Sequence, residues 1–221
     1  MARNAHPEET ERRILAAARS LFVEKGYEKT SIQDIVNALG DLSKGAIYHH
    51  FKSKDAILQR LNADDWAESV RLRDELLERR DLNALEKLRT LVLSSVRSAE
   101  HLNLVRSQLP TLDDPASFAA SMRFWSSELP TSLLPLLEEG MQDGSIPTAY
   151  PAQAAQLIAL LCNYWLLPCF YPASRPEMES RVRCLSAMLD AIDVHLFDGD
   201  AAEQVVDGLV ALASQGSNLA A

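Results

Sequence analysis

A short basic segment, residues 43–54, carries the side chains in this chain that are best suited to binding chemistry. The segment reads SKGAIYHHFKSK, with three Lys and two adjacent His around an aromatic pair, in a chain whose formal net charge is −9. Lys ammonium groups, His ring nitrogens and a Tyr hydroxyl all donate hydrogen bonds to oxygen acceptors. Phosphate oxygens and base edges are acceptors of this kind, so the segment favours contact with nucleic acid.

The charge of the chain is unevenly distributed. Residues 1–54 contain nine Lys and Arg and seven Asp and Glu, whereas the remainder contains 13 basic and 24 acidic residues. The acidic remainder would repel DNA or an anionic membrane, so only the N-terminal part can approach a phosphate backbone. Two parts of one chain with opposite charge balance are expected to meet different partners.

The composition is that of a soluble globular protein, with 221 residues of which 47% are hydrophobic and 24% charged. No apolar stretch reaches the roughly 20 residues that span a bilayer, and the charged N-terminus is unlike a secretory signal. The three cysteines, Cys162, Cys169 and Cys184, lie in or near apolar runs. We expect buried, reduced thiols in a cytoplasmic protein, with Cys162 and Cys169, seven apart, on one helix face.

Helices are the elements that must position the basic segment. Apolar residues from Ile14 to Phe22 recur at helical spacing, which predicts a helix with Thr10 as its N-cap and Gly26 at its end. A second short helix follows, capped by Thr30 or Ser31 and ended by Gly40. Ser43 can cap a third helix through KGAIYHHF, and Ser53 a long fourth one. Two short helices joined by a few residues, with a third beneath them, predict a helix-turn-helix.

The rest of the chain is also helical in period, and no alternating strand pattern of useful length is present. Pro130 and Pro135 should kink or split the longest of these segments. The pattern predicts an all-α protein, with further helices near 83–99, 102–109, 115–141, 151–171, 175–197 and 201–213.

Residues 9–60 resemble the DNA-binding module of the TetR family of transcriptional repressors. The resemblance rests on RRILAAARSLFVEKGYEKT followed by TSIQDIVNALGDLSKGAIYHHFKSKDAIL, which combine a Gly-Tyr helix end, a Thr-Ser cap and Tyr-His-His-Phe in one order. It implies an N-terminal helix-turn-helix DNA-binding domain over 1–54 and a helical ligand-binding and dimerisation domain over 55–221. One departure is the turn before the third helix, where two residues, Asp41 and Leu42, stand in place of the usual one.

The resemblance and the residue types together give the expected contacts with a double-stranded DNA operator. The third helix would enter the major groove, with Lys44 near its N-terminus reaching a phosphate or a guanine edge. Ile47 and Phe51 are expected in the core. Of the two His, one should face outward and the other partly inward. The expected DNA-binding residues are Thr30, Ser31, Gln33, Ser43, Lys44, Gly45, Ala46, Tyr48, His49, His50, Lys52 and Lys54.

The resemblance also implies a homodimer and a small-molecule effector for the C-terminal domain. Residues 151–197 carry apolar residues on more than one helix face, which favours an interface between two copies over a core within one subunit. Aromatic, Met and amide side chains near mid-domain suit a pocket for an apolar or aromatic effector. The candidate ligand-binding residues, each of which could instead be plain core, are Trp66, His101, Asn103, Gln108, Phe118, Met122, Trp125, Asn163, Tyr164 and Trp165.

The leading interpretation is a dimeric repressor released from a palindromic operator by a small-molecule inducer. A metal- or redox-responsive regulator on the same scaffold is the alternative, with Cys162, Cys169, His101 or His195 as sensing groups. The adjacent His49 and His50 lack the i, i+4 spacing and neighbouring ligands of a metal site, so no metal and no cofactor is expected. No nucleophile elbow, phosphate loop or dinucleotide motif points to an enzyme. A repressor and an activator look alike in sequence.

Overall fold

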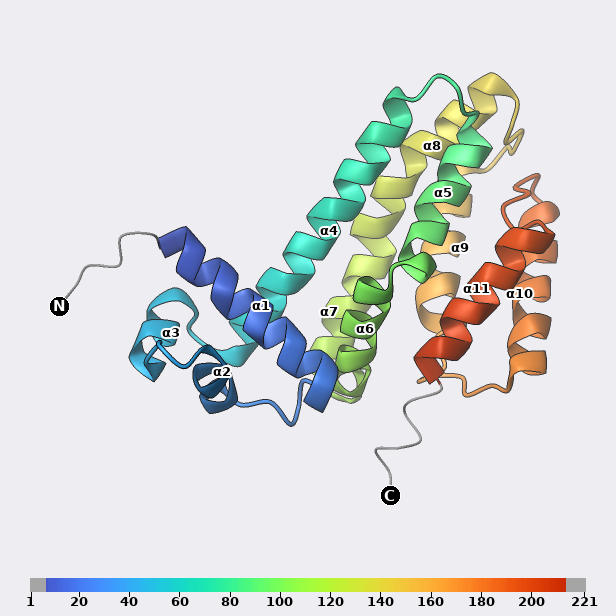
Figure 1. Ribbon diagram of the computed structural model, residues 1–221. Coiled ribbons are helices and arrows are strands. Elements are labelled where there is room, and N and C mark those ends of the chain that lie inside the picture. The colour runs from blue at the N-terminus through green and yellow to red at the C-terminus, as the bar shows by residue number, and fades with distance from the viewer. Residues whose placement is uncertain (1–6, 214–221) are drawn as a thin grey trace. The chain divides into compact units, whose positions relative to one another are not determined.

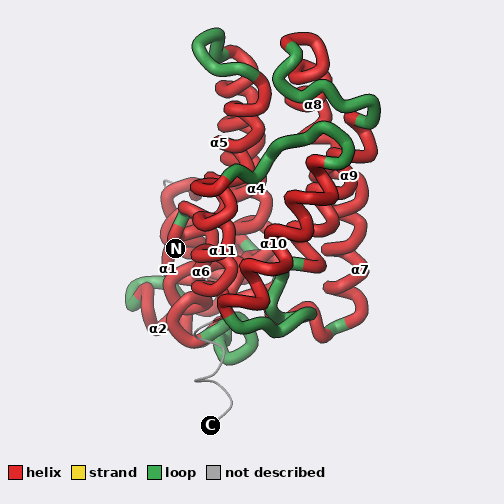
Figure 2. Tube along the Cα trace, turned by 90° about the vertical axis from the view of Figure 1, so that its right-hand side faces the viewer, coloured by secondary structure: helices red, strands yellow, loops and turns green. Residues whose placement is uncertain are grey.

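The computed structural model describes residues 7–213, and this part of the chain contains helices and no strand, so the all-α prediction is confirmed. Figures 1 and 2 show the helices and the turns that join them. The α-helices are α1 (Pro7–Lys25), α2 (Ile32–Leu39), α3 (Lys44–His50), α4 (Lys54–Glu78), α5 (Ala84–Arg97), α6 (Ala99–Gln108), α7 (Pro115–Arg123), α8 (Leu129–Asp143), α9 (Pro151–Leu160), α10 (Arg175–Asp190) and α11 (Gly199–Ala213).

The chain divides into two compact units. The first unit runs to Glu68 and also includes Asn103–Thr111, the C-terminal part of α6 with the turn after it. The second unit contains Ser69–Leu102 and the chain from Leu112 onward. Because α4 extends from Lys54 to Glu78, and α6 from Ala99 to Gln108, each of these two helices contributes residues to both units.

Helix α1 begins at Pro7, one turn earlier than the sequence pattern suggested. Proline is well tolerated in the first turn of a helix because its missing N–H has no intrahelical partner there. The expectation that Thr10 caps the helix is therefore wrong, since Thr10 lies inside α1 and is buried. The helix ends as predicted at Gly26, whose φ of 84° is a left-handed conformation that glycine adopts without strain.

The core of the first unit is a single apolar cluster. Ile14, Ala18 and Phe22 of α1 are fully buried, as are Ile35 of α2 and Ile47 of α3. The start of α4 adds Ile57 and Leu61 to the same cluster, and Leu104 of α6 joins it from a distant part of the sequence. The expected core positions Ile47 and Phe51 are confirmed.

The second unit is a bundle in which α8 packs on α9 and α5, while α11 packs on α5 and α10. Figures 1 and 2 both show α10 and α11 lying side by side. Glycine permits two close approaches in this unit. A Cβ on Gly208 of α11 would lie 2.6 Å from the Cβ of Val96 in α5, so these two helices approach more closely than a side chain would allow. A Cβ on Gly140 of α8 would lie 2.6 Å from Ile146, in the turn that follows this helix.

Two π-helical turns interrupt the long helices of the second unit. One, Phe124–Glu128, divides the predicted 115–141 segment into α7 and α8, and the other, Leu161–Trp165, follows α9. The first precedes Pro130, which has no N–H to give to the carbonyl four residues back, while Leu129 donates to Phe124 instead. Pro130 thus marks the predicted split, whereas Pro135 lies inside α8 without ending it.

Two predicted helices end earlier than their sequence pattern. The segment predicted at 175–197 is helical only to Asp190, because Asp193 adopts a left-handed φ of 58° and Val194 donates its N–H to the carbonyl of Leu189. This turn buries Val194 and Leu196 in the core without continuing the helix. The segment predicted at 151–171 ends its helical part at Trp165.

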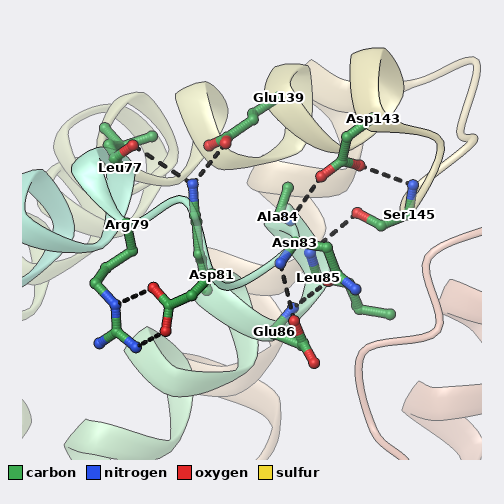
Figure 3. A network of polar contacts seen from close by, with 11 residues as sticks. Leu77, Arg79, Asp81, Asn83, Ala84, Leu85, Glu86, Glu139, Asp143 and Ser145 are labelled. Carbon is green, nitrogen blue, oxygen red and sulfur yellow. Dashed lines mark hydrogen bonds and ion pairs between the residues drawn. The ribbon is translucent and has the colours of Figure 1, made fainter.

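A polar network ties α4, α5 and α8 together in the second unit (Figure 3). The Lys87 ammonium of α5 lies 2.6 Å from Glu139 Oε1 of α8 and donates to the carbonyl of Leu77 in α4 at 3.4 Å. Asp143 of α8 accepts the N–H of Ala84 at the start of α5. Lys87 is 1% exposed, whereas the side chain of its partner Glu139 is only partly buried.

Candidate nucleic-acid interface

Local hydrogen bonds fix both short helices of the helix-turn-helix. Ser31 is the N-cap of α2 and forms a capping box with Asp34, each side chain bonding the backbone N–H of the other residue. Gly40 ends α2 with a φ of 73°. Ser43 caps α3, because its hydroxyl accepts the N–H of Ala46 at 3.2 Å. The predicted caps at Ser31, Ser43 and Ser53 are confirmed.

The two-residue turn between α2 and α3 is anchored at both positions. Leu42 packs against the core cluster of the unit. The Asp41 carboxylate accepts a hydrogen bond from the Arg13 guanidinium of α1 at 2.5 Å. This hydrogen bond holds the pKa of Asp41 below its ordinary value. The longer turn therefore does not leave α3 loosely held, since Leu42 is half-buried against the core and Asp41 is paired.

Helix α3 has a buried face and an exposed polar face. Ile47 is fully buried, whereas Tyr48 is 46% exposed and Lys44 is exposed one turn before it. The Lys44 ammonium lies 6.0 Å from the centre of the Tyr48 ring, so the two side chains share one face. His49 is exposed and His50 half-buried, which confirms the predicted difference between them.

Other predicted contact residues divide according to their surroundings. Gln33, Gly45 and Lys52 are exposed, and Ala46 is half-buried. The Gln33 amide donates to Asn37 within α2. Ser31 remains exposed, although its hydroxyl donates to Asp34 at 2.6 Å. Six members of the predicted set are thus exposed besides the capping residues Ser31 and Ser43: Gln33, Lys44, Gly45, Tyr48, His49 and Lys52.

The structure argues against direct DNA contact by Thr30 and Lys54. Thr30 is 2% exposed, and its hydroxyl lies within hydrogen-bonding distance of the carbonyls of Gly26, at 2.9 Å, and Leu21. Lys54 donates to the carbonyl of Tyr27 at 2.7 Å, and its ammonium lies 4.2 Å from the centre of that ring. Both polar groups hold the loop between α1 and α2 instead of facing outward.

Tyr27 is the centre of that loop. Its ring packs edge-on against Phe22, with 5.1 Å between the ring centroids, and its hydroxyl donates to Asp55 at the start of α4. Burial, with the neighbouring Asp55 carboxylate, raises the pKa of Tyr27 well above its ordinary value. The backbone N–H of Tyr27 bonds the carbonyl of Ser107 in α6. From the sequence, Tyr27 was recognised only as part of the Gly-Tyr pair at the end of the first helix, and its contacts with Asp55 and Ser107 were not predicted.

The second unit gathers aromatic rings from α7, both π turns and the turn after α9. Phe118 lies 6.2 Å from Tyr164 between ring centroids, and Phe170 lies 4.8 Å from Tyr164 and 6.4 Å from Trp125. The structure thus brings together three of the predicted pocket residues, Phe118, Trp125 and Tyr164. Sequence reasoning missed Phe170, which contacts all three rings, and Tyr171, because both follow the helix in a turn.

The predicted polar groups of the pocket are already engaged in the protein. Asn163 donates its amide to the carbonyl of Ala159 at 2.9 Å, one helical turn earlier. Gln108 forms a reciprocal amide pair with Asn62, with both N–O distances at 2.9 Å. Asn103 accepts from the guanidinium of Arg106.

The remaining candidates are partly buried, and the ten predicted residues do not all fall in one unit. Met122 and Trp165 belong to the second unit, as does His101, whose backbone N–H bonds the hydroxyl of Ser98. Trp66, Asn103 and Gln108 belong to the first unit.

The cysteines differ from the expectation of buried thiols on one helix face. Cys169 and Cys184 are exposed. Cys169 follows the end of the α9 helical segment, so it does not share a helix with Cys162. Burial raises the pKa of the Cys162 thiol to about 12. Within residues 7–213, no group of three His, Cys, Asp or Glu is placed to hold a metal ion. No helix in this range is long and apolar enough to cross a membrane.

The predicted dimerisation helices each bury one face within the protomer. Ala154, Ala155 and Ile158 of α9 are buried, as are Val182 and Leu185 of α10. Other apolar side chains of the same helices are not fully covered. Leu157 and Leu160 are half-buried and Met188 is 43% exposed. The structure therefore leaves part of the apolar surface of these helices uncovered within one subunit.

Comparison with known proteins agrees with this geometry. Residues 14–61, which span most of α1 through the start of α4, match the family described as bacterial regulatory proteins, tetR family. Over these residues the chain resembles the TetR family of transcriptional regulators. The resemblance that the sequence suggested is thereby confirmed.

Individual TetR-family proteins are similar to this chain over different lengths. The HTH-type transcriptional repressor KstR2 of Rhodococcus jostii is 32% identical over 141 residues, covering 60% of this chain and 65% of that protein. Its namesake from Mycolicibacterium smegmatis is 29% identical over 138 residues, with the same coverage. The chain thus spans less than two thirds of these curated relatives. A solved TetR-family regulator from Pectobacterium atrosepticum is 25% identical, with a TM-score of 0.61, over 87% of this chain and 98% of its own.

Proposed function

We propose that this protein is a transcriptional repressor that binds a palindromic operator as a homodimer through α3. The exposed face of α3 supports the proposal most directly. Lys44, Tyr48 and His49 lie open on this helix, while Ile47 holds its other side in the core. Tyr48 keeps 46% of its surface exposed, so its ring is available to a partner.

Each side chain on this face has a definite role in the proposal. Lys44, in the first turn of α3, reaches a phosphate or the O6 and N7 atoms of a guanine. The Tyr48 hydroxyl donates to a phosphate, and His49 donates to a phosphate or a base edge. Gly45 carries no side chain, so the helix backbone can lie close to the DNA. Gln33 in α2 and Lys52 after α3 add contacts to the flanking backbone.

Dimerisation through residues 151–197 would make the site palindromic. Two copies related by a twofold axis present two α3 helices, and these read half-sites one helical turn, about 34 to 36 Å, apart. The partly uncovered apolar side chains of α9 and α10 supply the surface for this contact. The functional domains are proposed as 1–54 for DNA binding and 55–221 for dimerisation and effector binding.

Selection of bound sequences from randomised DNA tests this proposal. The purified protein should recover a palindromic motif at moderate salt. Lys44→Ala should then weaken binding about 5- to 100-fold, corresponding to about 1–3 kcal/mol. It should also either relax one base position or lower the salt slope by about one. Arg80→Ala removes the same charge from an exposed site in the second unit and should bind like the parent.

Two results would count against the proposal. Recovery of no motif by the native protein would refute DNA reading by α3. If the Lys44→Ala and Tyr48→Phe variants bind a recovered motif as tightly as the parent protein does, the roles given to these residues are refuted.

We further propose that a small-molecule effector binds at the aromatic cluster of Phe118, Trp125, Tyr164, Phe170 and Tyr171 and releases the operator. Planar rings stack at centroid separations of 4.5 to 7 Å, and the rings of this cluster have that spacing from one another. The cluster is bordered by two π-helical turns, which occur often at functional sites. An apolar or aromatic compound is the class that such a surface favours.

Release of labelled operator DNA by a panel of phenols and aromatic acids tests the effector proposal. An active compound should lose potency against Phe118→Ala while the operator affinity of this variant without compound stays within about twofold. Val23→Ala changes an exposed apolar residue of the first unit and serves as the control. A compound that releases DNA equally from parent and Phe118→Ala would place the effector site elsewhere.

A further inference from the structure

The turn that precedes α3 contains a carboxylate where a DNA-binding surface should least tolerate one. Asp41 is the only acidic residue between Gly40 and Lys54, and it lies two positions before the Ser43 cap of α3. Its side chain is 60% exposed. A bare carboxylate here would repel the phosphates that Lys44 and Tyr48 are proposed to meet.

Arg13 supplies the opposite charge. Its guanidinium donates to Asp41 Oδ1 at 2.5 Å from a position 28 residues earlier, in the middle of α1. Ile14, the next residue along, is fully buried in the core of the unit, so the backbone that carries Arg13 is firmly placed. The pair thus joins the turn before α3 to a helix that contributes to the core of the first unit.

We propose that Arg13 supports operator binding through Asp41, whose carboxylate it neutralises, without itself contacting DNA. This inference rests on the proposed DNA-binding function. It also explains how the chain accommodates the two-residue turn, because Leu42 packs against the core while the extra charge of Asp41 is cancelled.

A double-mutant cycle on the recovered operator tests the inference. Arg13→Ala should weaken operator binding about three- to tenfold, because it exposes the Asp41 charge to DNA. Asp41→Asn should bind as tightly as the parent or better. The double variant should return to within about twofold of Asp41→Asn, since no charge is left to neutralise. Thermal unfolding of each variant verifies that it is folded.

Arg12 offers a matched control in the same helix. It pairs with Glu9 of the same helix at 2.7 Å, so Arg12→Ala should change operator affinity less than twofold. Loss of affinity in Arg12→Ala equal to that in Arg13→Ala would show a general effect of charge and overturn the inference.

The salt dependence separates this role from a direct phosphate contact. If Arg13 touches a phosphate, the double variant stays weak and its salt slope falls by about 0.9, which overturns the inference. Unchanged affinity in Arg13→Ala overturns it as well. Failure of the native protein to select any operator refutes the proposed function itself, and that result is seen before any variant is made.

Discussion

The ion pair between Lys87 and Glu139 leads us to predict that its two members contribute unequally to stability. Lys87 has 2% of its side chain exposed, whereas Glu139 has 33% exposed. Removal of Glu139 leaves a fully buried ammonium without its counter-ion, while removal of Lys87 leaves a carboxylate whose Oε2 is buried but which stands on a partly exposed side chain that can turn toward water. We therefore expect Glu139→Ala to destabilise the protein much more than Lys87→Met, although both variants break the same ion pair.

The magnitude follows from the geometry. At the observed 2.6 Å between Nζ and Oε1, two unit charges attract by about 6 kcal/mol in an effective dielectric constant of about 20. Removing both groups from water offsets much of this attraction. Breaking a buried pair by deleting one partner costs about 3–5 kcal/mol, and Glu139→Ala should fall near 3 because water enters the vacated volume. Lys87→Met replaces the stem with an apolar chain of similar length and should cost about 1 kcal/mol.

Urea unfolding followed by circular dichroism measures both values. The protein concentration must be the same in every experiment, because a homodimer would make the apparent stability depend on it. Glu139→Gln keeps an acceptor for Lys87 and should lie between the other two variants. Equal destabilisation by Lys87→Met and Glu139→Ala would refute the reasoning, since it would mean that exposure does not decide which member of the pair matters.

Three further predictions concern packing, acid stability and thiol reactivity. Gly208→Ala should lower the free energy of unfolding by about 1–2 kcal/mol, because the new Cβ would overlap Val96 in α5, while Gly199→Ala, with open space around it, should not destabilise. Asp34 has its pKa lowered by hydrogen bonds from the hydroxyl and backbone N–H of Ser31 and by Lys25. Its contribution is present above the unfolded-state pKa of about 3.9 and is lost as the pH falls, so Asp34→Asn should flatten the acid side of the stability profile measured by thermal melts. Burial raises the pKa of the Cys162 thiol to about 12, so at pH 8 a thiol-specific reagent should modify Cys162 more slowly than the exposed Cys169 and Cys184, as mass spectrometry of the modified peptides can show. Modification of Cys162 as fast as that of the two exposed thiols would contradict this.

The helix-turn-helix was the most predictable part of the molecule. Ser31, Gly40 and Ser43 mark helix ends through bonds to residues within four positions of them, and such bonds depend on nearby sequence alone. The core positions Ile14, Ile35 and Ile47 followed from helical spacing for the same reason. The same caps and core residues lie in the segments that resemble the TetR family.

Side chains near the site were harder to assign than the helices that carry them. Thr30 and Lys54 have the residue types of phosphate contacts, yet carbonyls of the α1–α2 loop take their donors. Nothing in the sequence indicated that Arg13 lies near the site, and only its hydrogen bond to Asp41 in the structure does so. Each of these outcomes depends on a partner 4 to 28 residues away, whose position only the packed core defines.

In the second unit the sequence determined that the chain is helical but not where each helix ends. Apolar spacing continues from residue 175 to 197, but the helix stops at Asp190 because Val194 and Leu196 are buried by a turn. Likewise, Phe170 and Tyr171 complete the aromatic cluster from outside the helix that carries Tyr164. By itself, the sequence determined the fold class, the DNA-binding module and its caps, because these arise from local periodicity and short-range hydrogen bonds. Only the tertiary structure decided which polar groups stay open and which rings meet, because burial and long-range contacts are properties of the packed chain.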